Sequence, residues 1–89
     1  MIQLGDEIIY NLNYFFEMYI EKENHRTNND SLFRCKVIDI INNNLMVINV
    51  ILPADVTFSD KAYDLRRCFQ TTNGSWNLAV IMDAFKFRE

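Results

Sequence analysis

The chain has 89 residues, a formal net charge of −3 and a hydrophobic content of 49%. That length fits a single domain, residues 1–89, with one modest core and little room for a deep enclosed active site. The apolar content lies far above the disordered range, so we expect the chain to fold. The acidic balance lacks the basic footprint that binding to duplex DNA requires.

The N-terminal sequence MIQLGDEIIY has no basic segment ahead of an apolar run, and no apolar run is long enough to span a membrane. We therefore expect a cytoplasmic protein in which Cys35 and Cys68 are buried, reduced thiols. Asparagine and isoleucine are frequent, as in low-GC genomes. This bias suggests a phage or viral protein that works in the host cytoplasm.

Residues 6–20 carry two apolar periodicities at once. A period of two places Tyr10, Tyr14 and Met18 on one face of a strand. Helical spacing instead gathers Phe15 and Tyr19 on one face of a helix. Because Tyr, Phe, Ile and Asn favour strands over helices, we expect one long first strand. The alternatives are an N-terminal helix and a bend that splits the segment.

A first β-hairpin is predicted in the middle of the chain. Residues 33–40 and 45–52 are rich in β-branched and apolar side chains, which favour strands. The intervening residues 41–44 contain three asparagines, which tolerate the backbone conformations of tight turns. After this hairpin, residues 57–60 (Thr-Phe-Ser-Asp) resemble the start of a short helix.

A second β-hairpin is predicted from residues 65–72 and 75–84, with the turn at Asn73-Gly74. An Asn-Gly pair between strand-like runs is the strongest short-range hairpin signal. It predicts a type I′ turn, in which both central residues have positive φ.

These elements predict a mainly β fold: a small five-stranded barrel, OB-like or SH3-like, of two hairpins, a long first strand and one short helix. The alternative is an α+β fold with an N-terminal helix on an antiparallel sheet. Residues 5–9, 33–38 and 64–66 resemble segments of Tudor-type SH3 barrels. The acidic-aromatic turn that builds the ligand cage of those domains is missing, so this resemblance implies a fold and no binding residues.

No catalytic or metal-binding motif is present in the sequence. His25 is the only histidine, and neither cysteine lies at ligand spacing from it or from the other cysteine. Gly5 and Gly74 are the only glycines, so there is no phosphate-cradling loop. We expect no catalytic residue, no cofactor and no metal ion.

The surplus of large apolar residues points to binding. A small barrel has one interior, so a second set of large apolar side chains should lie on its outer faces, as at protein interfaces. We therefore predict a non-enzymatic interaction module, a small accessory or regulatory protein that docks on a larger partner or forms a homodimer. The predicted contacts are Phe15, Tyr19, Ile81, Phe85 and Phe87. If the first element were a helix covering the sheet, most of them would be core.

Two alternative functions depend on other features. Arg66, Arg67, Phe69 and Trp76 could form a basic-aromatic platform for single-stranded nucleic acid or an acidic peptide, as in OB-type proteins. We expect instead that Phe69 and Trp76 belong to the core and that the arginines flank it. The remaining alternative is a structural subunit that assembles only with itself.

Overall fold

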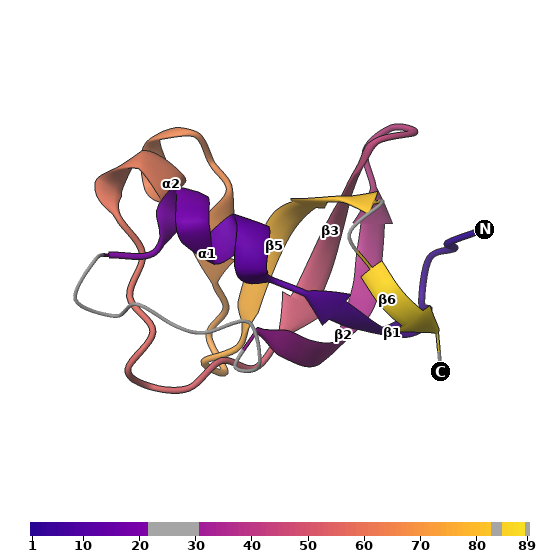
Figure 1. The fold of residues 1–89 in the computed structure, drawn as a ribbon, viewed down its shortest axis with the longest axis horizontal. Helices are drawn as coiled ribbons and strands as arrows, with labels where there is room; N and C mark the ends of the chain where they lie inside the picture. The colour runs from indigo at the N-terminus through magenta and orange to yellow at the C-terminus, as the bar shows by residue number, and fades with distance from the viewer. Residues whose placement is uncertain (22–30, 83–84, 89) are drawn as a thin grey trace.

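A computed structural model describes residues 1–21, 31–82 and the backbone of 85–88 (Figure 1). The fold is mainly β, as predicted, with two short helices beside one sheet. Neither helix is long and apolar enough to cross a membrane within this described part of the chain. The elements are β1 (Glu7–Asn11), α1 (Asn13–Tyr19), β2 (Leu32–Ile40), β3 (Leu45–Val50), α2 (Asp60–Asp64), β4 (Cys68–Gln70), β5 (Trp76–Ile81) and β6 (Phe85–Arg88).

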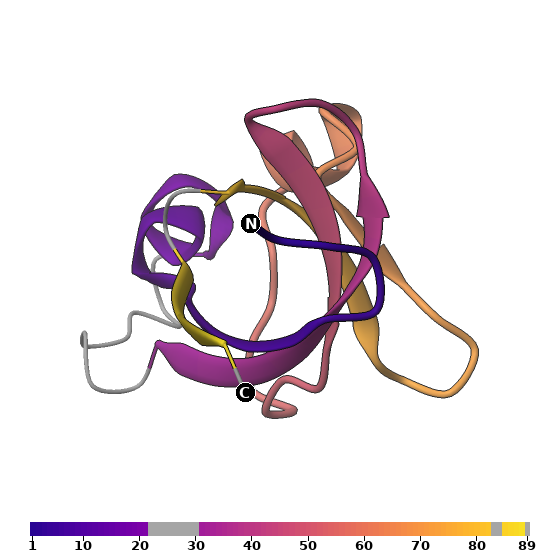
Figure 2. The same cartoon turned by 90° about the vertical axis from the view of Figure 1, so that its right-hand side faces the viewer.

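The six strands form one antiparallel sheet in the order β4-β5-β3-β2-β1-β6. The sheet is strongly curled, so that it surrounds the molecule's long axis when viewed from one end (Figure 2). Its strand order is nevertheless that of an open sheet with β4 and β6 at its edges. The sheet therefore has one strand more than predicted, and its ladders do not close into a barrel.

The predicted long first strand is wrong, because the chain bends at Leu12. Strand β1 ends at Asn11 and helix α1 begins at Asn13. The Asn11 side-chain oxygen accepts a hydrogen bond from the Asn13 backbone N–H at 2.8 Å, and the Leu12 carbonyl accepts the first helical bond from Phe16 at 2.8 Å. A polar side chain thus turns the backbone out of the strand. The period of two holds in β1, before the bend, and the helical spacing holds in α1, after it.

The first hairpin is confirmed, since β2 pairs with β3 around the turn at 42–44. The side-chain oxygen of Asn42 accepts hydrogen bonds from the backbone N–H groups of Asn44 (2.8 Å) and Leu45 (3.0 Å). A register shift between Val37 and Asp39 marks a β-bulge in β2. Bulges increase the local twist of a strand, which contributes to the curling of the sheet.

The second hairpin is confirmed in position but its turn type is wrong. Gly74 has φ 91°, whereas Asn73 does not have positive φ. The Gly74 N–H donates to the Thr71 carbonyl at 3.1 Å, and the Thr71 N–H donates to the Ser75 carbonyl at 2.8 Å. This pattern is a type I turn followed by a glycine bulge. The side-chain oxygen of Asn73 accepts a hydrogen bond from the Ser75 N–H at 3.1 Å, which fixes Asn73 in the turn.

The predicted short helix exists as α2, and it ends in a strained residue. Arg66 has φ 56°, in the left-handed region. The Arg67 N–H reaches back to the Ala62 carbonyl at 2.8 Å, and the Arg66 N–H donates to Tyr63 at 3.0 Å. This arrangement is the Schellman motif, which usually places glycine where Arg66 stands. The motif turns the chain directly from α2 into β4.

Aromatic side chains fill the end of the molecule where both helices lie, which we call the helical end. The Phe58 ring lies 5.0 Å from Trp76 and 5.6 Å from Phe15 between centroids, both edge to face. Phe15 in turn lies 4.8 Å from Tyr19. Edge-to-face pairs of this kind stabilise a core beyond the area they bury. The core continues along the concave face of the sheet through Ile8, Val37, Ile48 and Leu78, which are fully buried.

Candidate functional site

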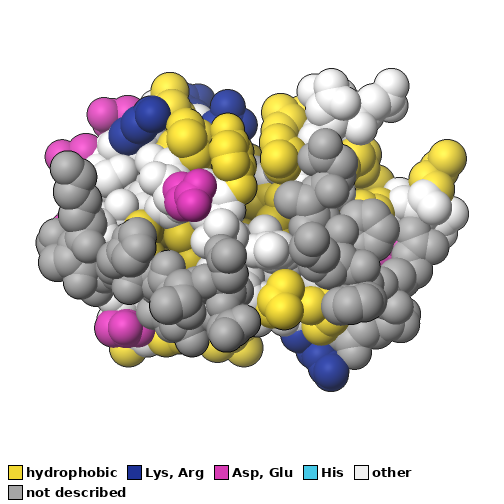
Figure 3. Space-filling model, in the orientation of Figure 1, with side chains coloured by type: hydrophobic (Ala, Val, Ile, Leu, Met, Phe, Trp, Pro, Cys, Tyr) yellow, Lys and Arg dark blue, Asp and Glu magenta, His cyan; other side chains and the backbone are white. Residues whose placement is uncertain are grey.

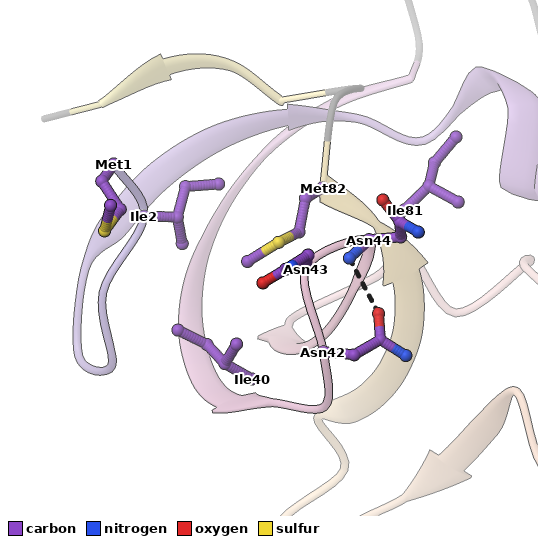
Figure 4. A pocket seen from close by; sticks show the side chains of 8 residues that line it. All are labelled: Met1, Ile2, Ile40, Asn42, Asn43, Asn44, Ile81 and Met82. Carbon is purple, nitrogen blue, oxygen red and sulfur yellow. Dashed lines mark hydrogen bonds between the residues drawn. The ribbon is translucent and has the colours of Figure 1, made fainter.

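A hollow of about 740 Å³ lies at the end of the sheet opposite the helices, which we call the open end. Ile2, Ile40 and Met82 point into the space that the curled sheet surrounds, whereas Ile81 points away from it (Figure 4). The hollow is lined by Met1, Ile2, Ile40, Asn42, Asn43, Asn44, Ile81 and Met82. Its walls are therefore mostly aliphatic, and its polar groups come from one turn.

The asparagine turn forms a fixed rim on this hollow. The Asn44 carbonyl accepts a hydrogen bond from the Met82 N–H at 2.9 Å, which ties the turn to the end of β5. Asn42 is occupied by the two backbone bonds that shape the turn. The asparagine turn on the rim is thus held in place by hydrogen bonds of the backbone.

A second, smaller hollow of about 130 Å³ lies between α1 and β5, and we call it the seam cleft. The Tyr10 hydroxyl donates to the Ile81 carbonyl at 2.5 Å, so a hydrogen bond joins β1 to β5 at this point. Hydrophobic side chains are exposed on the face that α1 crosses, with Lys and Arg side chains beside them near α2 (Figure 3). The cleft is lined by Tyr10, Tyr14, Phe15, Tyr19, Leu45, Arg67, Ala79, Val80 and Ile81.

Arg67 is the only charged residue among the described residues that line the seam cleft. Its backbone is fixed on both sides, since its N–H donates to Ala62 and its carbonyl accepts from the Ala79 N–H at 2.9 Å. The side chain is half-buried, and its Nε is a buried atom without a hydrogen-bond partner among the described residues. A buried polar group without a partner is energetically costly.

The predicted docking residues are not brought together on one surface. Phe15 and Tyr19 are only 5% and 9% exposed, because α1 turns them into the aromatic core. Their predicted placement on an outer face is wrong, and the helical alternative holds for both. Ile81 is 37% exposed and lies between the hollow and the seam cleft. Phe85 and Phe87 stand opposite Tyr10 and Ile9 in the β6–β1 ladder, and their side chains lie outside the described part.

The predicted basic-aromatic platform is divided between the inside and the outside of the molecule. Trp76 is 8% exposed and packs on Phe58, so its expected place in the core is confirmed. Phe69 is 58% exposed on β4, so its expected burial is wrong. Arg66 is exposed at the end of α2, whereas Arg67 lies in the seam cleft. These four residues therefore do not share one face.

Both cysteines are buried, as the sequence predicts, and lie on different strands as free thiols. Burial raises the pKa of Cys35 from 9.0 to about 12 and that of Cys68 to about 11. Such thiols stay protonated and are poor nucleophiles near neutral pH. His25 lies outside the described residues. Within the described ones, no three His, Cys, Asp or Glu side chains gather into a metal-binding group.

Sequence reasoning missed most of the residues that line the two hollows. Ile2, Ile40 and Met82 each look like ordinary core residues in the sequence. Their arrangement depends on which strand ends meet at the open end. The chain matches no protein-family model, no curated protein and no solved structure. A function must therefore be inferred from these two hollows themselves.

Proposed function

We propose that this chain is a non-enzymatic protein–protein interaction module whose open end accepts apolar side chains of a larger partner. The observation that supports this proposal is the aliphatic hollow of about 740 Å³ at the open end. That volume lies within the range of ordinary ligand pockets, which is large for an 89-residue chain. Ile41, 52% exposed, and Ile81 extend the apolar surface beyond the hollow.

The chemistry of the lining favours binding over catalysis. The eight described residues around the hollow are isoleucine, methionine or asparagine, and none of these eight has a titratable side chain. General acid–base and nucleophilic catalysis both require such side chains close to the substrate. An apolar centre with a polar rim is instead the usual anatomy of a protein interface. The asparagine turn supplies that rim.

The barrel predicted from the sequence is part of this proposal. Strand β5 pairs with β3, and β6, the next strand in the chain, pairs with β1. If β5 and β6 act as one bent strand, they complete a small barrel whose mouth is the hollow. Phe85 and Phe87 would then stand beside that mouth, and they stay proposed contacts. We place the module in the cytoplasm, that of the host if the protein is viral.

The test compares two methionines. Met82 lines the hollow, whereas Met18 is 38% exposed on α1 and lines neither the hollow nor the seam cleft. The tagged full chain and its Met82→Gln and Met18→Gln variants are used to capture proteins from the native host, with mass spectrometry and thermal melts. We expect one protein to be retained by the wild type and by Met18→Gln, and lost with Met82→Gln although that variant is folded.

Three outcomes would contradict the proposal. Equal retention by both variants would place the interface elsewhere. Retention of single-stranded nucleic acid with a steep salt dependence would favour the OB-type alternative. A wild type that forms only homo-oligomers by light scattering, with no other protein retained, would favour a self-assembling subunit.

A further inference from the structure

We propose that the seam cleft binds the carboxylate of an acidic side chain presented by the protein partner, with Arg67 as the anion-binding residue. This inference rests on the proposed interaction function and adds the chemistry of the partner segment. The occupant is an Asp or Glu that lies in the partner next to the apolar side chain entering the hollow.

The first argument is charge. Arginine side chains keep their positive charge in proteins. None of the nine described residues that line the seam cleft is acidic, and the buried Arg67 Nε has no hydrogen-bond partner among the described residues. The Lys61 Nζ lies 5.9 Å from the centroid of the Tyr19 ring, a residue that also lines the cleft. The described lining of the cleft therefore carries one positive charge, that of Arg67, and no negative charge.

The second argument is the polar capacity of the cleft. The hydroxyl of Tyr10 is occupied by the Ile81 carbonyl and is not free for a ligand. Tyr14 is 54% exposed and its hydroxyl has no hydrogen bond to the described residues, so this hydroxyl is a second donor at the rim. A guanidinium and a hydroxyl are donors that suit a carboxylate, and the aromatic walls lower the local dielectric constant and strengthen that attraction.

The third argument is size. The seam cleft, at about 130 Å³, is much smaller than the hollow, at about 740 Å³. A space of this size suits the end of an Asp or Glu side chain better than a nucleotide. The net charge of −3 also disfavours a polyanionic nucleic acid as the partner. A single acidic side chain is the anion that agrees with both observations.

The fourth argument is continuity with the hollow. Ile81 lines both the hollow and the seam cleft, so the two sites lie on either side of one residue. The Tyr10–Ile81 hydrogen bond fixes that residue between them. A partner segment can therefore place an apolar side chain in the hollow and a neighbouring carboxylate beside Arg67. This geometry predicts an apolar-acidic pair in the partner sequence.

The experiment is an NMR titration of the full chain with two blocked dipeptides, acetyl-Leu-Glu-amide and acetyl-Leu-Gln-amide. The Arg67 Nε–H resonance and the Ile81 methyl resonances are followed. We expect the glutamate peptide to shift both and the glutamine peptide to bind at least about tenfold more weakly, because a half-buried charge pair is lost. Arg67→Gln should weaken binding of the glutamate peptide to a similar extent, and the neighbouring Arg66→Gln should leave it unchanged.

Four results would overturn the proposal. Equal binding of the two peptides would show that the carboxylate is not recognised. An Arg67 Nε–H resonance that does not shift with the glutamate peptide would show that Arg67 does not bind it. Shifts caused by inorganic phosphate or a thymidine oligonucleotide, but not by the glutamate peptide, would assign the cleft to a phosphate. A shift of the Arg67 Nε–H resonance caused by Asp83→Asn in the free protein would show that a carboxylate of this chain, and not one of the partner, binds Arg67. The methionine comparison does not involve Arg67, so the proposed function can fail or stand independently.

Discussion

The helical end and the open end of the curled sheet are filled by different means. At the helical end, Phe15 and Phe16 of α1 pack with Phe58 and Tyr19 packs on Phe15, and all four side chains are buried. At the open end, mostly aliphatic side chains line a hollow. A helix can thus fill an end of a curled sheet with rings, whereas side chains projecting from strand ends leave space. We therefore expect the helical end to contribute most of the stability, and we propose that the open end binds the apolar part of a partner.

The strongest test of this comparison is Phe58→Ala at the helical end. Phe58 contacts three other rings, so its removal should leave a cavity and lower the free energy of unfolding by about 3–5 kcal/mol. Since small domains are stable by about 5–15 kcal/mol in total, the variant should be close to unfolding. Urea denaturation measures the change. A loss below about 1 kcal/mol would mean that the helical end is not tightly packed.

The matching change at the open end is Met82→Ala, and its effect should be smaller. Met82 is only partly buried and already faces a hollow, so little packing is lost and little new cavity is created. We expect a loss of about 1 kcal/mol by the same denaturation experiment. If the two variants lose equal stability, the helical end is not packed more tightly than the open end.

The pH dependence of stability tests how far the Cys35 thiol is shielded from water in the core. Its pKa is raised to about 12 by burial, so below pH 9.0 the thiol is neutral in both the folded and the unfolded chain and stability is unaffected. Above pH 9.0 the unfolded thiol ionises first, and unfolding becomes easier by at most about 1.4 kcal/mol per pH unit. The melting temperature should fall between pH 9 and 12, and less steeply in Cys35→Ala. Parallel slopes would contradict this assignment.

The smallest expected effect concerns the strained end of α2. Arg66 has φ 56°, which costs a residue with a Cβ about 1–2 kcal/mol, whereas glycine adopts it freely but loses more entropy on folding. Arg66→Gly should therefore stabilise the protein by less than about 1 kcal/mol. Arg66→Ala, which keeps the Cβ, should give no gain. Equal melting temperatures for both variants would show that backbone strain is not the cause.

Local patterns predicted those elements that local interactions determine. The first hairpin depends on β-branched runs and on asparagines that bond their own backbone, as Asn42 does. The second turn was correctly placed, but its type depends on the Asn73 side chain accepting from Ser75, which the Asn-Gly pair alone does not reveal. The turn position was therefore predictable and its geometry was not.

The remaining features depend on residues far apart in the sequence. The bend at Leu12 places Phe15 against Phe58, more than forty positions away, and this contact could not be read from residues 6–20. For the candidate sites, Ile81 was predicted to contact a partner, and it does lie between the two hollows. Arg67 was considered for a platform, yet its position beside Tyr14 follows from the Schellman turn and the path of α1.

The pairing of β1 with β6 has a consequence for the way the fold is completed. Strand β1 is synthesised before the other described strands, but one of its two neighbours in the sheet is β6, the last of them. The Tyr10 hydroxyl likewise donates to the carbonyl of Ile81, which is synthesised 71 positions later. Until those residues are made, one edge of β1 is open to pairing with another nascent chain. Contacts of such high sequence separation form slowly, so β1 is among the last of these strands to be protected on both edges.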